Sequence, residues 1–283
     1  MSIEEIFPGA VLGQKPVEGD WVSIERHNQV IYLPAGELTE RERYLLGMLD
    51  EESKDTSLKD PWLAYFLGEK EVMPLDLSKV QLVYIEHQFP FSAELVELME
   101  LMEGLLANVV AMPNLTPTRS LMILDQTKVL DARVIIEDLL PTIESDFAMS
   151  LTVAFGNTWS NVRGSDLQAY FADENRLFSD YLMHRGETQT VTFASLALWA
   201  LVNQLAQPSI KKKVLQQIGS MEDMSDVITR LWQEHGNLMQ TAQHLFIHRN
   251  SLQYKLDKFQ SLSGLNLKNL DDLAYCYLLI QEI

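Results

Sequence analysis

The stretch that decides the fold lies near the carboxyl end and reads Gly236-Asn237-Leu238-Met239-Gln240-Thr241-Ala242-Gln243-His244-Leu245-Phe246-Ile247-His248-Arg249-Asn250-Ser251-Leu252-Gln253-Tyr254-Lys255-Leu256. It predicts two short helices joined by a tight turn. Gly236 is suited to end the preceding helix, and Asn237 is suited to cap the next one. Ala242 is small at a position where two helices must approach closely. The sequence here therefore predicts a compact helical pair.

The second helix of this pair has two chemically distinct faces. The apolar residues expected in the buried seam are Leu238, Leu245, Ile247, Leu252, Leu256 and Phe259, of which the last three follow an i, i+4, i+7 spacing. The opposite stripe consists of Arg249, Asn250, Gln253, Tyr254 and Asp257. Cationic, amide and phenol groups at the start of a helix suit phosphates and base edges of a major groove. The residues alone leave a second reading open, an ordinary helical bundle in which Arg249 and Asn250 only cap a helix.

The segment resembles the C-terminal helix-turn-helix of the PucR/CdaR family of bacterial transcription regulators. That family's pattern has an Asn, a small pair, then Leu-x-Ile-His-Arg-Asn-Thr-Leu-x-Tyr-Arg-Leu and later Leu-Ser/Thr-Gly-x-x-Leu. The matching residues are Asn237, Thr241, Ala242, Leu245, Ile247, His248, Arg249, Asn250, Ser251, Leu252, Tyr254, Lys255, Leu256, Leu262, Ser263, Gly264 and Leu267. The resemblance covers about residues 225–283. A weaker similarity connects the segment to the Fis-type helix-turn-helix.

Three positions depart from the family pattern. Thr241 replaces the first of the usual alanine pair, Ser251 replaces threonine, and Lys255 replaces arginine. Serine keeps the hydroxyl group. Lysine keeps the charge but lacks the bidentate fork of a guanidinium, so we expect a weaker phosphate contact there.

The resemblance implies a sequence-specific DNA-binding transcription regulator that acts on promoter DNA as a homodimer, with a small-molecule effector, no cofactor and no enzymatic activity. The candidate DNA-binding residues are His248, Arg249, Asn250, Ser251, Gln253, Tyr254, Lys255 and Lys258. The helix-turn-helix framework is assigned to Asn237, Ala242, Leu245, Ile247, Leu252 and Leu256. For His248, a local capping role stays open beside DNA contact.

Residues 1–75 predict an irregular α+β segment. Residues 21–25 and 29–33 have the β-type apolar content of a hairpin. Thr39 and Glu42 form a capping box that predicts a helix start. Residues 61–68 predict a second short helix, with proline at the front and glycine at the rear.

Residues 76–208 alternate between strands and helices. Strands are expected at 81–86, 120–125 and 151–156, the last ending in a turn at Gly156, and helices at 92–110, 131–146 and 165–184, with Pro141 kinking or dividing the second. This order indicates an α/β region with a mixed sheet and packed helices. It resembles a degenerate GGDEF-like domain, which implies a sensory or dimerisation role without cyclase activity.

From residue 209 to residue 283 the pattern is all-helical. Helices are expected at about 210–218, 223–235, 237–245, 249–261 and 270–282, with the helix-turn-helix at about 237–260. The fold class is thus an α+β and α/β amino-terminal and middle region followed by an all-α DNA-binding domain.

The charge is distributed unevenly. The chain has 22 basic and 40 acidic residues and a net charge of −18. Residues 209–283 hold eight residues of each sign, so the whole excess lies in residues 1–208, and residues 236–268 carry a net +3. The acidity excludes a non-specific nucleic-acid coat and a basic membrane-binding face. We expect weak non-specific DNA binding, with specificity from few contacts and dimerisation.

Other features point to a cytoplasmic, non-membrane protein. Cys276 is the single cysteine, so no disulfide framework or cysteine zinc cluster can form. The first residues are acidic, unlike a signal peptide, and the longest apolar run, 194–202, predicts a buried helix because a bilayer crossing needs about 20 residues.

Several other features of the sequence suit functions other than DNA binding. His235, His244 and His248 are separated by the helix joint, and no nearby cysteine or acidic ligand completes a metal site. Residues 211–213, three lysines, suit either a solvated helix start or a phosphate contact. No glycine-rich phosphate loop and no Gly-x-Ser-x-Gly elbow occurs. A metabolite- or protein-binding adaptor with a vestigial helix-turn-helix, and a nucleotide-handling enzyme in the α/β region, remain alternatives.

Overall fold

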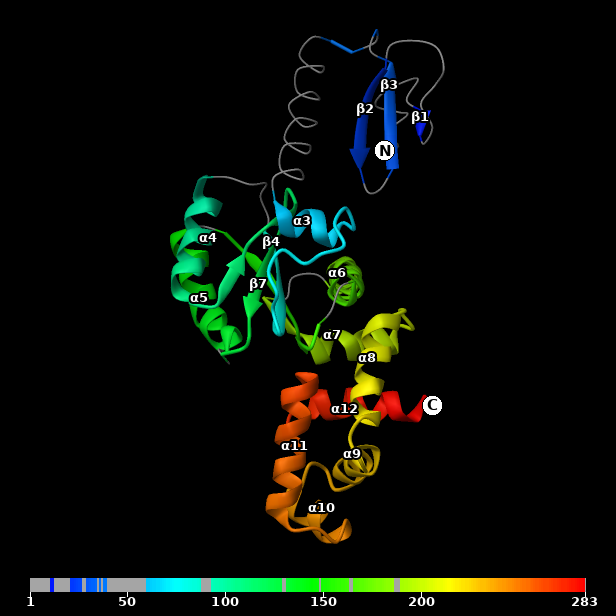
Figure 1. Cartoon of the computed structure of the whole chain (residues 1–283). Helices are drawn as coiled ribbons and strands as arrows, with labels where there is room; N and C mark the ends of the chain where they lie inside the picture. Colours follow the sequence, from blue (N-terminus) through cyan, green and yellow to red (C-terminus); the bar gives the residue numbers. More distant parts are fainter. Residues whose placement is uncertain are drawn as a thin grey trace. The chain divides into compact units, whose positions relative to one another are not determined.

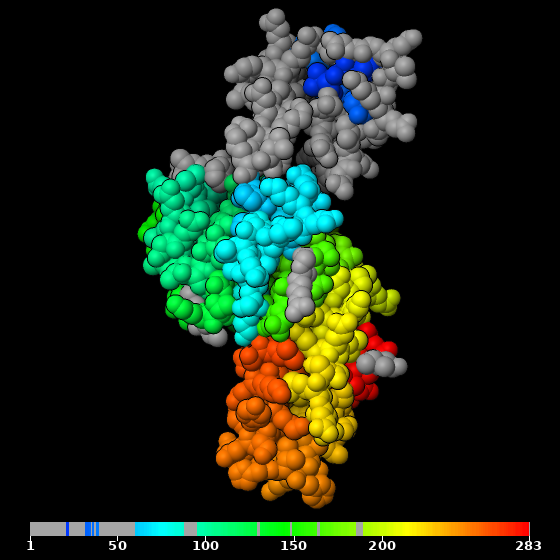
Figure 2. All heavy atoms as spheres, in the orientation of Figure 1, coloured from blue at the N-terminus to red at the C-terminus, as the bar shows by residue number. Residues whose placement is uncertain are grey.

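The computed structural model describes residues 11–12, 21–26, 29–34, 36, 38–39, 60–87, 93–128, 131–147, 149–162, 165–185 and 189–282. Contacts within the chain divide it into two units, Met1–Pro61 and Trp62–Ile283. Each unit has a sheet of its own, and each is described by itself below (Figures 1 and 2).

The first unit contains a three-stranded antiparallel sheet in the order β1-β3-β2. Its strands are β1 (Val11–Leu12), β2 (Trp21–Arg26) and β3 (Gln29–Pro34). Arg26 is paired with Gln29, so only two residues connect β2 to β3, as in a tight hairpin. The predicted hairpin is confirmed. The helix predicted to begin at Thr39 falls on residues 40–50, outside the described residues.

The second unit is built on a mixed sheet in the order β5-β7-β4-β8-β9, with β6 also paired to β7. The strands are β4 (Lys79–His87), β5 (Val109–Ala111), β6 (Asn114–Thr116), β7 (Arg119–Asp125), β8 (Leu151–Ser160) and β9 (Thr190–Thr192). β4 pairs antiparallel with both β7 and β8, whereas β9 runs parallel to β8. The mixed sheet predicted from the alternating pattern is confirmed.

The two faces of this sheet are covered by different helices. Val83 and Ile85 of β4 pack with α4 (Ala93–Leu105) and α5 (Ala132–Asp146). Leu82 and Tyr84, the alternate residues, pack with the other face's helices, α3 (Pro61–Phe66), α6 (Asp166–Arg185) and α7 (Phe193–Val202). This period of two is what a strand buried on both faces requires. Figure 1 shows α4 and α5 side by side, on the side of the sheet opposite to α6.

The carboxyl-terminal part consists of five helices at the predicted places. They are α8 (Pro208–Gly219), α9 (Met224–Gln233), α10 (Leu238–His244), α11 (Arg249–Ser263) and α12 (Leu270–Gln281). Their buried side chains, such as Leu231 and Tyr275, belong to the same apolar cluster as Tyr84 and Trp159 of the sheet. The core is therefore continuous across residue 208, where the sequence analysis placed a boundary.

The other boundary also differs from the sequence-based one. The chain divides after Pro61, whereas a limit near residue 75 was expected. The reason is that Trp62, Tyr65 and Phe66 of α3 are buried in the core of the second unit. There the ring centroids of Phe66 and Phe171 lie 4.4 Å apart.

Two expectations about single elements need correction, and a third is narrowed to one of its alternatives. β8 does not end at Gly156 but continues to Ser160, because Gly156 lies where the pairing with β4 shifts register, as in a β-bulge. The helix expected over 92–110 ends at Leu105, and residues 109–111 turn back to pair with β7. Of the two outcomes expected at Pro141, a kink or a division of the helix, the division is excluded, because α5 runs from Ala132 to Asp146 with an exposed Pro141 inside it.

The longest apolar run forms the buried helix α7, as predicted. Within the described residues, no helix has the length and apolarity that a bilayer crossing requires.

Candidate nucleic-acid interface

The first helix of the pair, α10, begins and ends as its sequence dictates. Gly236, at φ +79°, ends the preceding turn in a conformation that favours glycine. Oδ1 of Asn237 accepts hydrogen bonds from the backbone N–H groups of Met239 at 3.1 Å and Gln240 at 3.2 Å. Thr241 and Ala242 are buried. Asn237 thus fixes the start of α10, and the small Ala242 side chain lets α10 lie close to its neighbours.

The turn between α10 and α11 depends on an unusual residue. Phe246 adopts φ +54°, a left-handed conformation that ends α10, and its side chain is 96% exposed. The next amide, of Ile247, donates to the carbonyl group of Ala242 at 3.0 Å. Leu245 and Ile247, on either side, pack partly buried against the core. The turn therefore reverses the chain while two of its three apolar side chains hold it in place.

The second helix, α11, separates a buried stripe from an exposed face. Leu252, Leu256 and Phe259 are at most 2% exposed. The side chains at Arg249, Asn250, Ser251, Tyr254 and Lys258 are exposed, and Tyr254 is 68% exposed. Helical periodicity predicted this division. The exposed face begins at the amino-terminal end of α11, where the helix dipole favours negative groups such as phosphates.

His248 is the cap of α11. Its Nδ1 accepts a hydrogen bond from the backbone N–H of Asn250 at 3.2 Å, and its carbonyl group accepts one from the backbone N–H of Leu252 at 3.1 Å. An accepting Nδ1 must be unprotonated. Of the two roles left open for His248, the structure displays capping.

Two further candidate DNA-binding side chains are engaged within the protein. The amide nitrogen of Gln253 donates to both carboxylate oxygens of Asp257, at 2.8 and 2.9 Å, and Asp257 also forms an ion pair with Lys268 at 3.0 Å. These two partners lower the pKa of Asp257 below its usual value. Nζ of Lys255 donates to the carbonyl group of Glu222 at 3.2 Å. Gln253 and Lys255 must leave these partners, or share them, to contact DNA.

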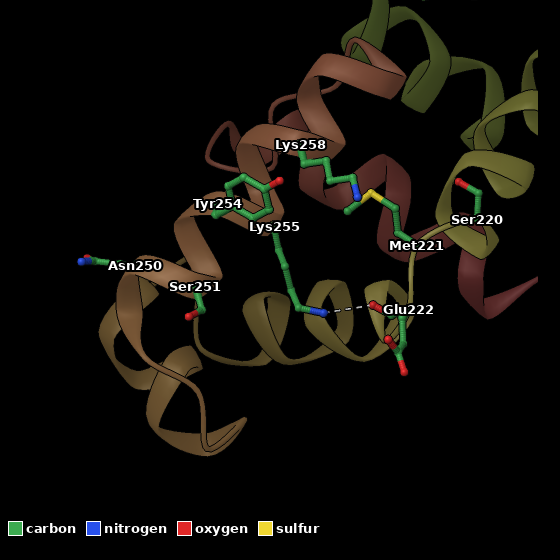
Figure 3. Close-up of a pocket in the computed structure, with 8 residues that line it drawn as sticks. All are labelled: Ser220, Met221, Glu222, Asn250, Ser251, Tyr254, Lys255 and Lys258. Atoms are coloured by element: carbon green, nitrogen blue, oxygen red, sulfur yellow. Dashed lines mark hydrogen bonds between the residues drawn. The ribbon is translucent and has the colours of Figure 1, made fainter.

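Five of the eight candidates line one pocket of about 530 Å³ beside α11. It is lined by Ser220, Met221, Glu222, Asn250, Ser251, Tyr254, Lys255 and Lys258. Figure 3 shows Lys255 and Lys258 extending from α11 toward the α8–α9 connection, which carries the first three residues. No sequence pattern predicts these three residues, because their proximity to α11 arises from packing between helices separated along the chain.

The histidines of this region do not converge. Nδ1 of His244 lies 2.6 Å from a carboxylate oxygen of Glu234, and His248 caps α11. In the described part of the chain, no group of three or more His, Cys, Asp or Glu side chains has the arrangement of a metal site.

A short capped helix, a tight turn and a second helix with a buried stripe and a polar exposed face define a helix-turn-helix protein. Residues 229–281 match the model of the PucR C-terminal helix-turn-helix domain. A leucine-rich protein of Streptococcus dysgalactiae subsp. equisimilis is 37% identical over 99% of both chains. The carbohydrate diacid regulator of Escherichia coli K12 is 22% identical over 96% of this chain and 77% of its own. The chain belongs to the PucR/CdaR family of transcription regulators.

One solved structure was also similar. The regulator of polyketide synthase expression from Bifidobacterium adolescentis aligns with 88% of this chain and 94% of its own, at 13% identity and a TM-score of 0.37.

Proposed function

We propose that this regulator binds specific promoter DNA by inserting the amino-terminal half of α11 into the major groove. The observation that carries the proposal is the exposed face of α11, where Arg249, Asn250, Ser251, Tyr254 and Lys258 lie opposite a fully buried stripe. Arginine and asparagine side chains are the commonest bidentate partners of guanine and adenine edges, and lysine and tyrosine suit phosphates.

Charge supports the same surface. Residues 236–268 carry a net +3 in a chain of net −18. The acidic remainder repels DNA from other surfaces, which leaves the helix-turn-helix as the favourable approach. Such a protein has weak non-specific affinity, and its specificity depends on a small number of contacts.

We further propose that two copies act together. One helix-turn-helix buries little DNA surface, and two-fold dimers of this motif bind half-sites about 34 Å apart. In this proposal the α/β region receives a metabolite or cell-state signal, the protein works in the cytoplasm, and it catalyses no reaction. Its operator is then an inverted repeat.

The test begins with mapping the DNA that the protein occupies in cells, followed by fluorescence anisotropy on a duplex carrying the enriched sequence. Arg249→Ala is expected to weaken binding about tenfold or more and to reduce the slope of log Kd against log salt by about one if the contact is to phosphate. The matched control is Arg133→Ala, which removes the same charge from the exposed surface of α5.

Two results would contradict the proposal. One is unchanged affinity of Arg249→Ala at matched salt. The other is the absence of any enriched, salt-dependent DNA site, which would favour an adaptor that binds metabolites or proteins.

A further inference from the structure

The carboxyl-terminal end of α11, far from its DNA-facing start, is fastened to the sheet. The last carbonyl groups of a helix have no partner within the helix. Here the carbonyl group of Ser261 accepts a hydrogen bond from the hydroxyl group of Ser160 at 3.1 Å. The carbonyl group of Ser263 accepts one from the side-chain amide of Asn157 at 2.8 Å. Both donors belong to β8. The carbonyl group of Leu262 accepts a hydrogen bond from the side-chain amide of Gln217, on α8, at 2.9 Å. Three consecutive carbonyl groups of α11 are therefore held by side chains from outside the helix.

Gly264 shows that the backbones are also in close contact there. It follows α11 at φ +79°, a conformation that L side chains rarely adopt. A Cβ atom at this position would overlap Oδ1 of Asn157 and lie 2.5 Å from the carbonyl oxygen of Thr158. The end of α11 can approach β8 this closely only because residue 264 has no side chain.

The residue that fastens α11 is itself held by a buried carboxyl group. The bulge at Gly156 releases Asn157 from regular pairing with β4. The backbone N–H of Asn157 instead donates a hydrogen bond to Oε1 of Glu174, on α6, at 3.0 Å. Trp159 donates its indole N–H to the same oxygen at 3.0 Å, and Tyr84 donates its hydroxyl to Oε2 at 3.0 Å. A β-bulge commonly re-aims a side chain in this way. Glu174, Asn157 and Ser263 thus form a continuous chain of hydrogen bonds from α6 through β8 to α11.

We propose that Asn157 is a positioning residue for the recognition helix, and that the α6–β8–α11 contact transmits a structural change in the α/β region to the DNA-facing residues. This inference rests on the proposed DNA-binding function. The mechanical reason is the length of α11, which has 15 residues and spans about 22 Å. A tilt of about 10° at its fastened end moves its amino-terminal end by about 4 Å, which exceeds the tolerance of any hydrogen bond to a base.

The experiment compares three variants of the full chain. Asn157→Leu keeps the approximate shape of the side chain and removes the donor. Gly264→Ala forces the same contact apart from the α11 side. Ser120→Ala is the control, because Ser120 is buried in β7 and bonded to Asn114 within the α/β region.

The first readout is hydrogen exchange measured by mass spectrometry, which does not depend on DNA. In Asn157→Leu and Gly264→Ala, the amides of the last turn of α11 are expected to exchange about tenfold faster, with β7 unaffected. Ser120→Ala is expected to leave the last turn of α11 unchanged. Equal exchange at this turn in all three variants and the wild type would overturn the proposal.

The second readout is affinity for the mapped duplex. Both interface variants are expected to bind about tenfold more weakly, while the slope of log Kd against log salt stays that of the wild type, because no phosphate contact is removed. A reduced slope, or wild-type affinity despite faster exchange, would overturn the positioning role. Should the wild type bind no DNA, the proposed function fails, while hydrogen exchange still decides whether β8 fastens α11. If Asn157→Leu does not fold, Ser160→Ala removes one bond of the same set and is expected to show the same changes in smaller degree.

Discussion

Replacement of Glu174 by glutamine tests how a buried carboxyl group sets the stability of the second unit. Glu174 is 1% exposed and accepts three hydrogen bonds, from Asn157, Trp159 and Tyr84. Burial raises its pKa to about 8, because removal from water outweighs the three hydrogen bonds, which act in the opposite direction. At neutral pH the folded protein therefore keeps this group mostly protonated.

The sign of the pH dependence follows from the two pKa values. In the unfolded chain the group titrates near its ordinary value of 4.5, whereas in the folded chain it titrates near 8. Between these values the unfolded chain has lost the proton and the folded chain has kept it, so stability is greatest below 4.5 and falls as pH rises toward 8. The loss approaches about 1.4 kcal/mol for each pH unit.

A window from about pH 6 to about pH 7.5 isolates this effect. Burial also raises the pKa of Asp272, to about 6. The stability that Asp272 loses with rising pH is therefore mostly lost before the window begins. Across the window, Glu174 is expected to lower the free energy of unfolding by about 2 kcal/mol. Glutamine has the same shape and does not titrate. Its oxygen can accept the two bonds made to Oε1, and its amide can donate to the Tyr84 hydroxyl oxygen.

The assay is urea denaturation followed by circular dichroism at several pH values in the window. The free energy of unfolding of the wild type, relative to Glu174→Gln, is expected to fall by about 2 kcal/mol from the acidic to the alkaline end. Glu103→Gln, an equal change at an exposed position of α4, is the control and is expected to run parallel to the wild type. Parallel profiles for wild type and Glu174→Gln would refute the argument that Glu174 is buried as the neutral acid.

The remaining predictions concern α11. His248→Ala removes the side-chain cap and is expected to lower the free energy of unfolding by about 1 kcal/mol in urea denaturation; an unchanged value would show that the Nδ1 contact contributes nothing. Asp257→Asn removes a negative charge from the exposed face and weakens the hold on Gln253 and Lys268, so tighter operator binding is expected by anisotropy, with the gain shrinking as salt is raised. Weaker binding of Asp257→Asn at low salt would place that carboxylate among the groups that organise the interface.

The sequence predicted the helix-turn-helix well because its signals are local. Asn237 as a cap, Ala242 at a close approach and the Leu252, Leu256 and Phe259 stripe all act within one or two helical turns. The candidate DNA-binding face could likewise be read from periodicity. The turn at Phe246 was less readable, because a phenylalanine takes the left-handed position that glycine usually fills.

The features that sequence reasoning missed depend on contacts between distant residues. Asn157 and Ser263 are 106 residues apart, and no period or motif links them. Gly156 was interpreted as a turn because glycine in a strand signals either a turn or a bulge, and only the position of Glu174 and β4 distinguishes the two. Trp159 is another example, since it is fully buried and its ring stacks on that of Tyr170, with the ring centroids 4.4 Å apart.

The continuous core across residue 208 bears on whether the carboxyl-terminal helices can fold by themselves. The hydroxyl group of Tyr275, on α12, donates a hydrogen bond to Oε1 of Gln207 at 2.9 Å. The ring centroids of Tyr275 and Phe193, on α7, lie 5.8 Å apart. Severing the chain near residue 208 would strip α12 of these partners and expose apolar surface of the cluster it shares with the sheet. The helix-turn-helix is therefore expected to lose stability when it is separated from the sheet and α7, because its helices bury their apolar side chains in the core that they share with those elements.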